Sequence, residues 1–409
     1  MKKVLAVLLA FAMILSFAAC GEKKEEPKKE EVKTYKIGMV CIGDETQAYD
    51  QNFYKAADAA KEQLAKDGIN IEWLYTKKHV EGEPVKEDNE TLAEEGCLVI
   101  FNNSYGHEPA MLQVAPNYPN ITFVGCTNEV SMRDDLDNTI NAFPDVFEVR
   151  YLAGIAAGMK LNELIEKGEI KADEARIGYV GAYTFAEVMS GYTAFFLGAQ
   201  SVCPSATMYV NFIGSWGDYA KEQDAAKLLI EDYNCKVISQ HSDQVSPAVV
   251  AQEKGVYHVG YNIAMSGDSI APNASIISSR IDWTNFFVKV IKAAVNGEKQ
   301  DQDYIGFGLS TGDVALTELN TKVAAPGTQE AIDKAAAAIK DGSLQVFDTS
   351  KFTVEGKPVE SFLVDMTGDF VGDEGYEAIF DGYFHESYFK SAPAFNIQID
   401  GITLTNVAF

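Results

Sequence analysis

Short apolar runs alternate with amphipathic stretches along most of this 409-residue chain. The apolar runs predict buried strands, and the amphipathic stretches between them predict helices, the first of which ends at Gly68. In the first half, strands are expected at residues 35–43, 69–76, 97–104 and 121–126, and helices at 50–68, 83–96 and 108–119. A strand–helix alternation of this kind implies a parallel sheet with helices on both faces.

The same alternation starts again after a long predicted helix at residues 145–168. The expected strands then lie at residues 175–183, 207–215, 235–242, 256–262 and 274–283, with helices at 185–202, 219–234, 245–255 and 284–297. We therefore expect an α/β protein with two Rossmann-like lobes of similar size. The predicted lobes are residues 34–140 plus about 280–310, and residues 141–279, with the strand near 276–281 returning the chain to the first lobe. Residues 311–409, with a helix at 327–342, are expected to pack on the lobes.

The N-terminus predicts export. Two lysines precede an apolar stretch at residues 4–15, which is short for a membrane span and typical of a signal peptide, here residues 1–19. The following "LSFAAC" resembles a bacterial lipobox, although Phe17 stands where Leu is usual, so Cys20 is the expected lipidated residue. The alternative is an ordinary cleaved signal peptide.

Residues 20–33 are almost all charged and are expected to form an extended tether. Together with a lipid on Cys20, the tether would hold the protein on the extracytoplasmic face of the cell membrane.

Charge and cysteine content narrow the functional classes. The net charge is −26, and no basic cluster follows the tether, which argues against nucleic acid as a partner. Five cysteines follow Cys20, which is an odd number, so we expect buried free thiols. They show neither a CxxC motif nor a zinc-binding spacing, and we expect no metal or cofactor.

Polar and aromatic residues follow five of the predicted strands, at residues 43–45, 102–108, 214–218, 239–243 and 260–262. Ligands of open parallel sheets bind beyond the carboxyl ends of strands, and clefts between two such units are preferred ligand sites. The strand-end candidates for ligand binding are Asp44, Tyr105, His107, Trp216, Asp218, Asp243, Tyr261 and Asn262.

His241, Ser242 and Asp243 could suggest a hydrolase. However, the chain has no G-x-S-x-G elbow, and adjacent residues at a strand end point to different sides. No acidic cluster suited to calcium appears at a predicted strand end either. We therefore do not expect an enzyme, and we interpret His241 as a structural residue.

Several blocks resemble the basic membrane protein family, whose members are surface lipoproteins that serve ABC importers as substrate-binding proteins and include purine nucleoside receptors. The resemblance covers about residues 36–315 and is carried by "YLAGIAAG" (151–158), "FFLGAQSVCP" (195–204), "GSWGDYAKEQDAA" (214–226), "SQHSD" (239–243) and "EKGVYHVGYN" (253–262). It implies the type I periplasmic binding protein fold, with two lobes joined by three hinge strands. It also implies a nucleoside held between aromatic rings in the cleft, and an ABC permease as partner.

The resemblance assigns roles to individual residues. Trp216 falls on the family's aromatic stacking position, although a core tryptophan is the alternative. The run "TQAYD" (46–50) matches the family's D-x-S-F-N, so that Tyr49 keeps the aromatic and Asp50 replaces Asn. Asp44 is the candidate replacement for the first Asp, and Tyr105 is a second stacking candidate. His107 is either a ligand contact or merely a residue at a helix start.

One departure concerns the sugar. Relatives carry a ribose-binding Asp two residues after the motif that is Gly260–Asn262 here, and this chain has Ala264. A free nucleobase, or a sugar held differently, fits this departure. The sequence thus predicts a lipid-anchored receptor for a purine nucleoside or nucleobase, with a receptor for a sugar or another small polar solute as the alternative.

Overall fold

The computed structural model describes residues 33–79, 81–126, 136–368 and 371–409. The chain divides into residues 1–33 and a compact unit from Thr34 to Phe409, and everything below concerns the second unit. The expected signal peptide, the lipidated Cys20 and the tether as far as residue 32 lie outside the described residues. In the described part of the chain, no helix is both long and apolar enough to cross a membrane.

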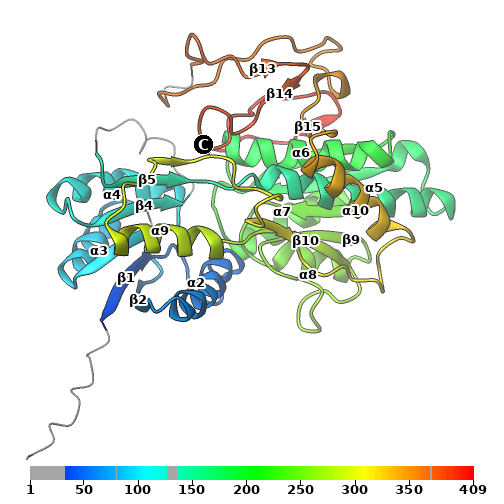
Figure 1. Ribbon diagram of the computed structural model, residues 1–409. Helices are drawn as coiled ribbons and strands as arrows, with labels where there is room; N and C mark the ends of the chain where they lie inside the picture. Colours follow the sequence, from blue (N-terminus) through cyan, green and yellow to red (C-terminus); the bar gives the residue numbers. More distant parts are fainter. Residues whose placement is uncertain (1–32, 80, 127–135, 369–370) are drawn as a thin grey trace, which may run out of the picture. The chain divides into compact units, whose positions relative to one another are not determined.

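The first sheet has six strands in the order β11-β5-β4-β3-β1-β2, all paired in parallel. The strands are β1 (Thr34–Val40), β2 (Asn70–Thr76), β3 (Cys97–Asn102), β4 (Thr122–Cys126), β5 (Thr139–Ala142) and β11 (Asp303–Tyr304). Its helices are α2 (Ala48–Lys66), α3 (Glu83–Glu94), α4 (Glu108–Val114) and α9 (Thr284–Asn296). Apolar residues of α9 pack on those of α2 and β3, which places this helix beside the first sheet (Figure 1).

The second sheet has seven strands in the order β12-β10-β9-β8-β6-β7-β15. The strands are β6 (Arg176–Gly181), β7 (Thr207–Phe212), β8 (Val237–Gln240), β9 (Tyr257–Tyr261), β10 (Ser275–Ile281), β12 (Val314–Leu316) and β15 (Ile402–Leu404). Its helices include α5 (Val146–Glu166), α6 (Ala186–Val202), α7 (Tyr219–Glu231) and α8 (Ser246–Glu253). Strand pairs are parallel except β10 with β12, so the expected α/β class with parallel sheets is confirmed.

The chain passes between the two sheets three times in the described residues. It leaves the first sheet after β5, returns between β10 and α9, and leaves again between β11 and β12. We expected the strand near residues 276–281 to make the return, but β10 pairs with β9 and β12 in the second sheet along its length. The return is therefore made just after this strand, at residues 282–283.

The C-terminal residues 311–409 extend the second sheet at both edges. β12 pairs with β10 at one edge, and β15 pairs with β7 at the other. Between these strands, α10 (Thr328–Lys340) packs against α5, and the short β13 (Ile379–Phe380) and β14 (Tyr383–Phe384) pair with each other. Figure 1 shows the segment that carries β13 and β14 beyond α6, on the outer side of the second sheet.

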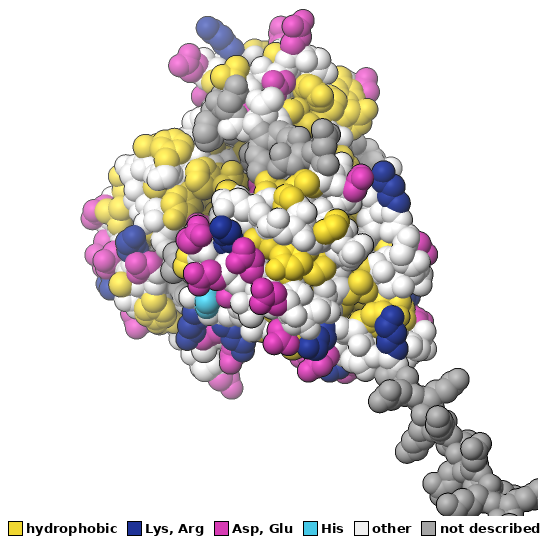
Figure 2. All heavy atoms as spheres, turned by 90° about the vertical axis from the view of Figure 1, so that its left-hand side faces the viewer, with side chains coloured by type: hydrophobic (Ala, Val, Ile, Leu, Met, Phe, Trp, Pro, Cys, Tyr) yellow, Lys and Arg dark blue, Asp and Glu magenta, His cyan; other side chains and the backbone are white. Residues whose placement is uncertain are grey.

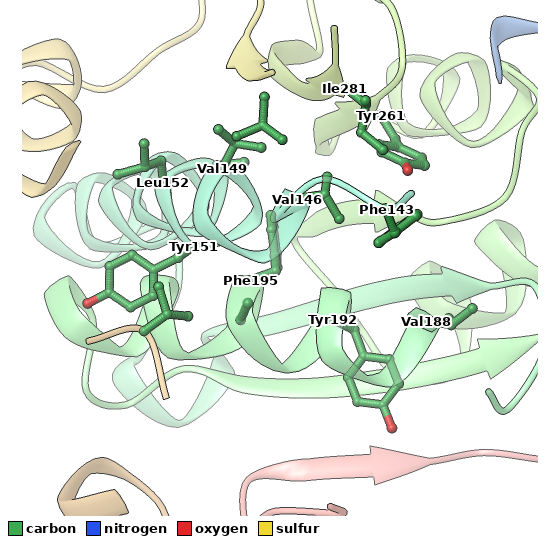
Figure 3. Close-up of a cluster of buried hydrophobic side chains, with 14 of the residues drawn as sticks. Phe143, Val146, Val149, Tyr151, Leu152, Val188, Tyr192, Phe195, Tyr261 and Ile281 are labelled. Atoms are coloured by element: carbon green, nitrogen blue, oxygen red, sulfur yellow. The ribbon is translucent and has the colours of Figure 1, made fainter. Parts of the chain in front are cut away.

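Helices α5 and α6 cross with almost no space between their backbones. A Cβ atom added to Gly154 would lie 1.9 Å from the carbonyl oxygen of Phe195, and one added to Gly198 would lie 1.9 Å from that of Tyr151. Buried apolar side chains surround this crossing (Figure 3). The crossing holds α6 against α5, and the first turn of α6 carries Glu187, which lines the pocket described next.

Candidate functional site

A pocket lies between the carboxyl ends of the two sheets. Its lining comes from the first sheet's side (Ile42, Tyr49, Ser104, Tyr105) and from the second sheet's side (Glu187, Trp216, His241, Asp243, Tyr261). The free volume is about 20 Å³, room for about one water molecule. A planar solute therefore requires the facing rings to move apart.

Aromatic rings dominate the mouth of this pocket. Phe185 stacks on Tyr105, with ring centroids 5.4 Å apart, and on Tyr183, at 5.1 Å. Trp216 meets Tyr183 edge-on at 5.2 Å, and its indole nitrogen donates to Oε1 of Glu81 at 3.1 Å. Trp216 is half-buried and borders the pocket, so the alternative of a core tryptophan does not describe its position.

The start of α2 brings Tyr49 and Asp50 beside the pocket. The Tyr49 hydroxyl donates to the carbonyl of Asn103 at 2.6 Å and lines the pocket. Asp50 lies just behind the lining and is fully buried, with Oδ1 accepting from the Asn103 amide at 2.9 Å and from the Gly43 N–H at 3.2 Å. Burial raises the pKa of Asp50 to about 6. Its Oδ2 has no hydrogen-bond partner among the described residues.

Two carboxylates line the pocket from the second sheet's side. Asp243 follows β8, and its Oδ2 accepts from the Gln47 side chain of the first lobe at 3.2 Å. Burial, together with the nearby carboxylates of Glu222 and Asp50, raises the pKa of Asp243 well above its usual value. Glu187, in the first turn of α6, lies 3.2 Å from Nε2 of His241. These oxygens are acceptors for N–H or O–H groups of a solute.

A buried cation supports the floor of the pocket. The guanidinium of Arg150 lies 3.6 Å from the centre of the Tyr261 ring and donates to the carbonyl of Gln240 at 2.8 Å. Burial, and secondarily the Arg150 charge, lowers the pKa of His241 well below its usual value, so this imidazole is neutral. His241 therefore lines the pocket as a neutral imidazole whose Nε2 lies beside Glu187.

Asn262 lies behind the pocket lining. Its backbone is left-handed, with φ of 70°, and its side-chain oxygen accepts from the Asn52 amide of the first lobe at 3.1 Å. The side-chain nitrogen of Asn262 is buried and has no hydrogen-bond partner in the part of the chain that the structure describes. Asn262 thus joins the two lobes next to Tyr261, which does line the pocket.

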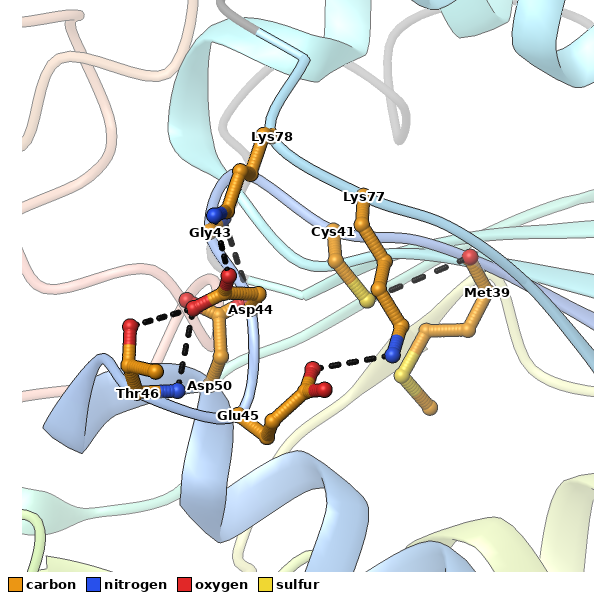
Figure 4. A network of polar contacts seen from close by, with 9 residues as sticks. All are labelled: Met39, Cys41, Gly43, Asp44, Glu45, Thr46, Asp50, Lys77 and Lys78. Carbon is orange, nitrogen blue, oxygen red and sulfur yellow. Dashed lines mark hydrogen bonds and ion pairs between the residues drawn. The ribbon is translucent and has the colours of Figure 1, made fainter.

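Besides Asp50 and Asn262, three more of the predicted site residues lie outside the pocket lining. Asp44 pairs with Lys78 at 2.5 Å and accepts from Thr46, which lowers its pKa (Figure 4). Asp218 is the N-cap of α7 and accepts from two backbone N–H groups of its first turn. His107 is buried in the 3-10 turn Tyr105–His107, where burial lowers its pKa to about 3.

Other residues at the site were not predicted from the sequence: Gln47, Glu81, Tyr183, Phe185 and Glu187. Tyr183, Phe185 and Glu187 directly follow the strand predicted at residues 175–183, so the strand-end argument could have found them. Gln47 and Glu81 are half-buried polar residues that precede α2 and α3, and neither follows a predicted strand directly. No group of three or more His, Cys, Asp or Glu residues suited to a metal ion occurs in the described ranges.

Comparison with known proteins agrees with this arrangement. Residues 37–346 match the family model described as ABC transporter substrate-binding protein PnrA-like, which confirms the resemblance to the basic membrane protein family. A purine-binding protein from Brucella abortus is 27% identical over 344 residues, covering 83% of this chain and 89% of that protein. A protein from Haloferax volcanii, provisionally named an ABC transporter glucose-binding protein, is 30% identical over 309 residues, covering 74% and 73%.

Solved structures share the fold. An ABC transporter solute-binding protein from Conexibacter woesei superposes with a TM-score of 0.59 at 18% identity, covering 76% of this chain and 98% of that one. One from Aeropyrum pernix gives a TM-score of 0.60 at 15% identity, covering 76% and 93%. These likenesses confirm the expected type I periplasmic binding protein fold.

Proposed function

Because this chain belongs to the PnrA-like family of ABC transporter substrate-binding proteins, we propose that it captures a purine nucleoside or nucleobase between its two lobes for import. One observation carries the proposal: Trp216 and Tyr105, from opposite lobes, border the same pocket with their rings 6.4 Å apart. A flat heterocycle that entered between rings on two lobes would stack on both. Stacking on an aromatic side chain contributes about 1–3 kcal/mol per base.

The polar side chains supply orientation. Asp243 and Glu187 offer carboxylate oxygens at the pocket wall, and Asp50 lies behind it. Carboxylates accept hydrogen bonds from amino groups and protonated ring nitrogens, which purines carry at their edges. Leaving such a group unpaired in a closed pocket costs about 1–3 kcal/mol, so these residues would select among heterocycles of similar shape.

A sugar is the second candidate ligand. The relative from Haloferax volcanii carries the name of a glucose-binding protein, and two pocket carboxylates also suit sugar hydroxyls. The two candidates differ in what the aromatic rings contact, since a purine presents two flat π faces and a pyranose presents C–H groups and a rim of hydroxyls.

Calorimetry decides between them. We expect binding of at least one among adenine, guanine, adenosine, guanosine and inosine, and weaker or no binding of glucose. Trp216→Ala should weaken purine binding about tenfold or more, because it removes one stacking face. Tyr219→Ala, at an exposed aromatic outside the pocket, is the control and should bind as the wild type does. Absence of binding for all five purines would refute the purine assignment.

The proposed route to the membrane is a lipid on Cys20 followed by the charged tether, with an ABC permease as the partner that receives the solute. Cys20→Ala should then release the protein from the membrane fraction into the soluble one. Retention of this variant on membranes would show that something other than a lipid on Cys20 holds the protein.

A further inference from the structure

A second cavity adjoins the pocket and shares Tyr105 with it. We call it the outer chamber, and its volume is about 380 Å³. Tyr105 lines both cavities, and Phe185, stacked on Tyr105 at 5.4 Å, lines the outer chamber. The Tyr105 ring, which stacks on Phe185, is therefore a wall that the inner pocket and the outer chamber share. A solute that separates these rings would reach both spaces.

The outer wall of this chamber comes from the C-terminal segment. Its residues there include Phe362, Leu363, Asp365, Lys390 and Asn396. All of them lie beyond residue 346, where the match to the family model ends. This wall of the chamber is therefore built by a part of the chain that the family model does not include.

This segment is attached firmly to both lobes. Next to Lys390, Ser391 donates to the carboxylate of Asp303 in β11 of the first sheet, at 2.5 Å from its hydroxyl and 2.7 Å from its N–H. On the other lobe, the Thr184 N–H donates to the Ala408 carbonyl at 2.7 Å. The Ala408 N–H in turn donates to the Thr184 hydroxyl oxygen at 3.0 Å. The wall thus has a defined position at the mouth of the cleft.

The lining of the chamber combines flat apolar faces with donors and acceptors. Phe185 and Phe362 provide rings, while Asn396 is exposed and offers an amide with both a donor and an acceptor. Lys390 is buried and donates to the carbonyl of Asp365 at 2.8 Å, which places an ammonium group in the wall. Hydroxyl groups donate and accept at once, and the C–H faces of a sugar ring pack on aromatic rings, so this lining suits a glycosyl group.

We propose that the outer chamber binds the hydroxyl-rich, glycosyl part of the solute while the heterocycle occupies the inner pocket. This inference rests on the proposed function and adds to it where the sugar lies and which residues hold it. The solute is then a nucleoside in preference to a free base, and the C-terminal segment contributes to its selection.

The test compares matched pairs of ligands on matched variants of the full-length protein. Calorimetry on adenine with adenosine, and guanine with guanosine, measures the contribution of the sugar. We expect the wild type to bind the nucleoside about tenfold more tightly than the base, as two or three added hydrogen bonds would provide. Leu363→Trp fills the chamber from a partly exposed position and should reduce this ratio to about threefold or less without changing base affinity.

Asn396→Ala should reduce the ratio by a smaller factor, because it removes one amide from the wall. Ile305→Trp, at a similarly exposed apolar position outside the chamber, is the control for added bulk and should keep the wild-type ratio. An unchanged nucleoside preference in Leu363→Trp, or equal affinity of base and nucleoside in the wild type, would overturn the inference while leaving purine binding in place. Failure of every base and nucleoside to bind would overturn the proposed function, and the chamber's role with it.

Discussion

Glu222 lies in the first turn of α7, close to the pocket carboxylate Asp243, and is fully buried. Its Oε1 accepts from the Gln244 N–H at 3.2 Å, yet burial dominates and raises its pKa to about 8. The folded protein therefore holds a proton on Glu222 that the unfolded chain releases near its ordinary pKa. Between about pH 4.5 and pH 8 this group lowers the free energy of unfolding as the pH rises.

Glu222→Gln should remove that pH dependence. The side-chain oxygen of the new glutamine can still accept the hydrogen bond from the Gln244 N–H. Unlike Glu222, the glutamine stays uncharged at high pH, so no buried charge forms. We expect the variant and the wild type to unfold similarly near pH 5, and the variant to be more stable by about 2–5 kcal/mol near pH 9. Denaturant unfolding at both pH values measures this. Glu231→Gln, on the exposed end of the same helix, is the control, and an equal gain from it would contradict the explanation.

The position of a residue directly after a predicted strand was a useful guide to the pocket, whereas its side-chain type alone was not. Tyr105, Trp216 and Asp243 follow strands, and the structure brings them to one pocket. Asp44 and Asp218 also follow strands, but an Asp at such a position serves equally well to cap a turn or a helix, and here both do. The choice between a cap and a pocket wall depends on side-chain direction, which the sequence pattern does not specify.

At the scale of elements, the α5–α6 crossing shows how strongly two glycines can constrain a fold. Gly154→Ala would place a methyl group where the Phe195 carbonyl lies, on backbone that belongs to a helix and cannot move alone. We expect the helices to be forced apart and the free energy of unfolding to fall by at least about 2 kcal/mol. Thermal unfolding measures the loss. Gly267→Ala has nothing within 4 Å of the added Cβ and should be nearly neutral, and a comparable loss there would contradict the role of the crossing.

The longer helices and strands could be predicted because the apolar residues within each of them recur at the spacing of that element. The predicted helix at residues 145–168 and the predicted strand at 235–242 correspond to α5 and β8. By contrast, β5, β12 and β15 were not expected, since each has three or four residues and forms through pairing with a distant strand. Their existence depends on the tertiary structure, which local periodicity does not contain.

At the scale of the whole compact unit, acidic and basic side chains are interspersed over the face drawn in Figure 2, and no basic patch forms on its described residues. Over the residues that the structure describes, three passages of the chain join the two lobes, so their relative position depends on these covalent links and on the contacts across the cleft.

Side-chain hydrogen bonds across the cleft hold the lobes together in this structure. Gln47 donates to Asp243 at 3.2 Å, and Asn52 donates to Asn262 at 3.1 Å. Neither donor lines the pocket, so both can be removed without deleting a wall of the site. A typical hydrogen bond contributes about 0.5–1.5 kcal/mol, so removing both should shift the balance toward separated lobes by about 1–3 kcal/mol.

The double variant Gln47→Ala, Asn52→Ala should therefore bind its solute about tenfold more weakly, because only the closed fraction has both stacking faces in place. Small-angle scattering should show a larger radius of gyration for the ligand-free variant than for the wild type, and saturating ligand should return it to the wild-type value. Gln329→Ala, on the exposed face of α10, removes a comparable amide and should change neither quantity. Weaker binding without expansion would mean that one of the two amides contacts the solute directly. Unchanged binding and unchanged dimensions would mean that the aromatic contacts between the lobes, such as that of Tyr105 with Phe185, suffice for closure.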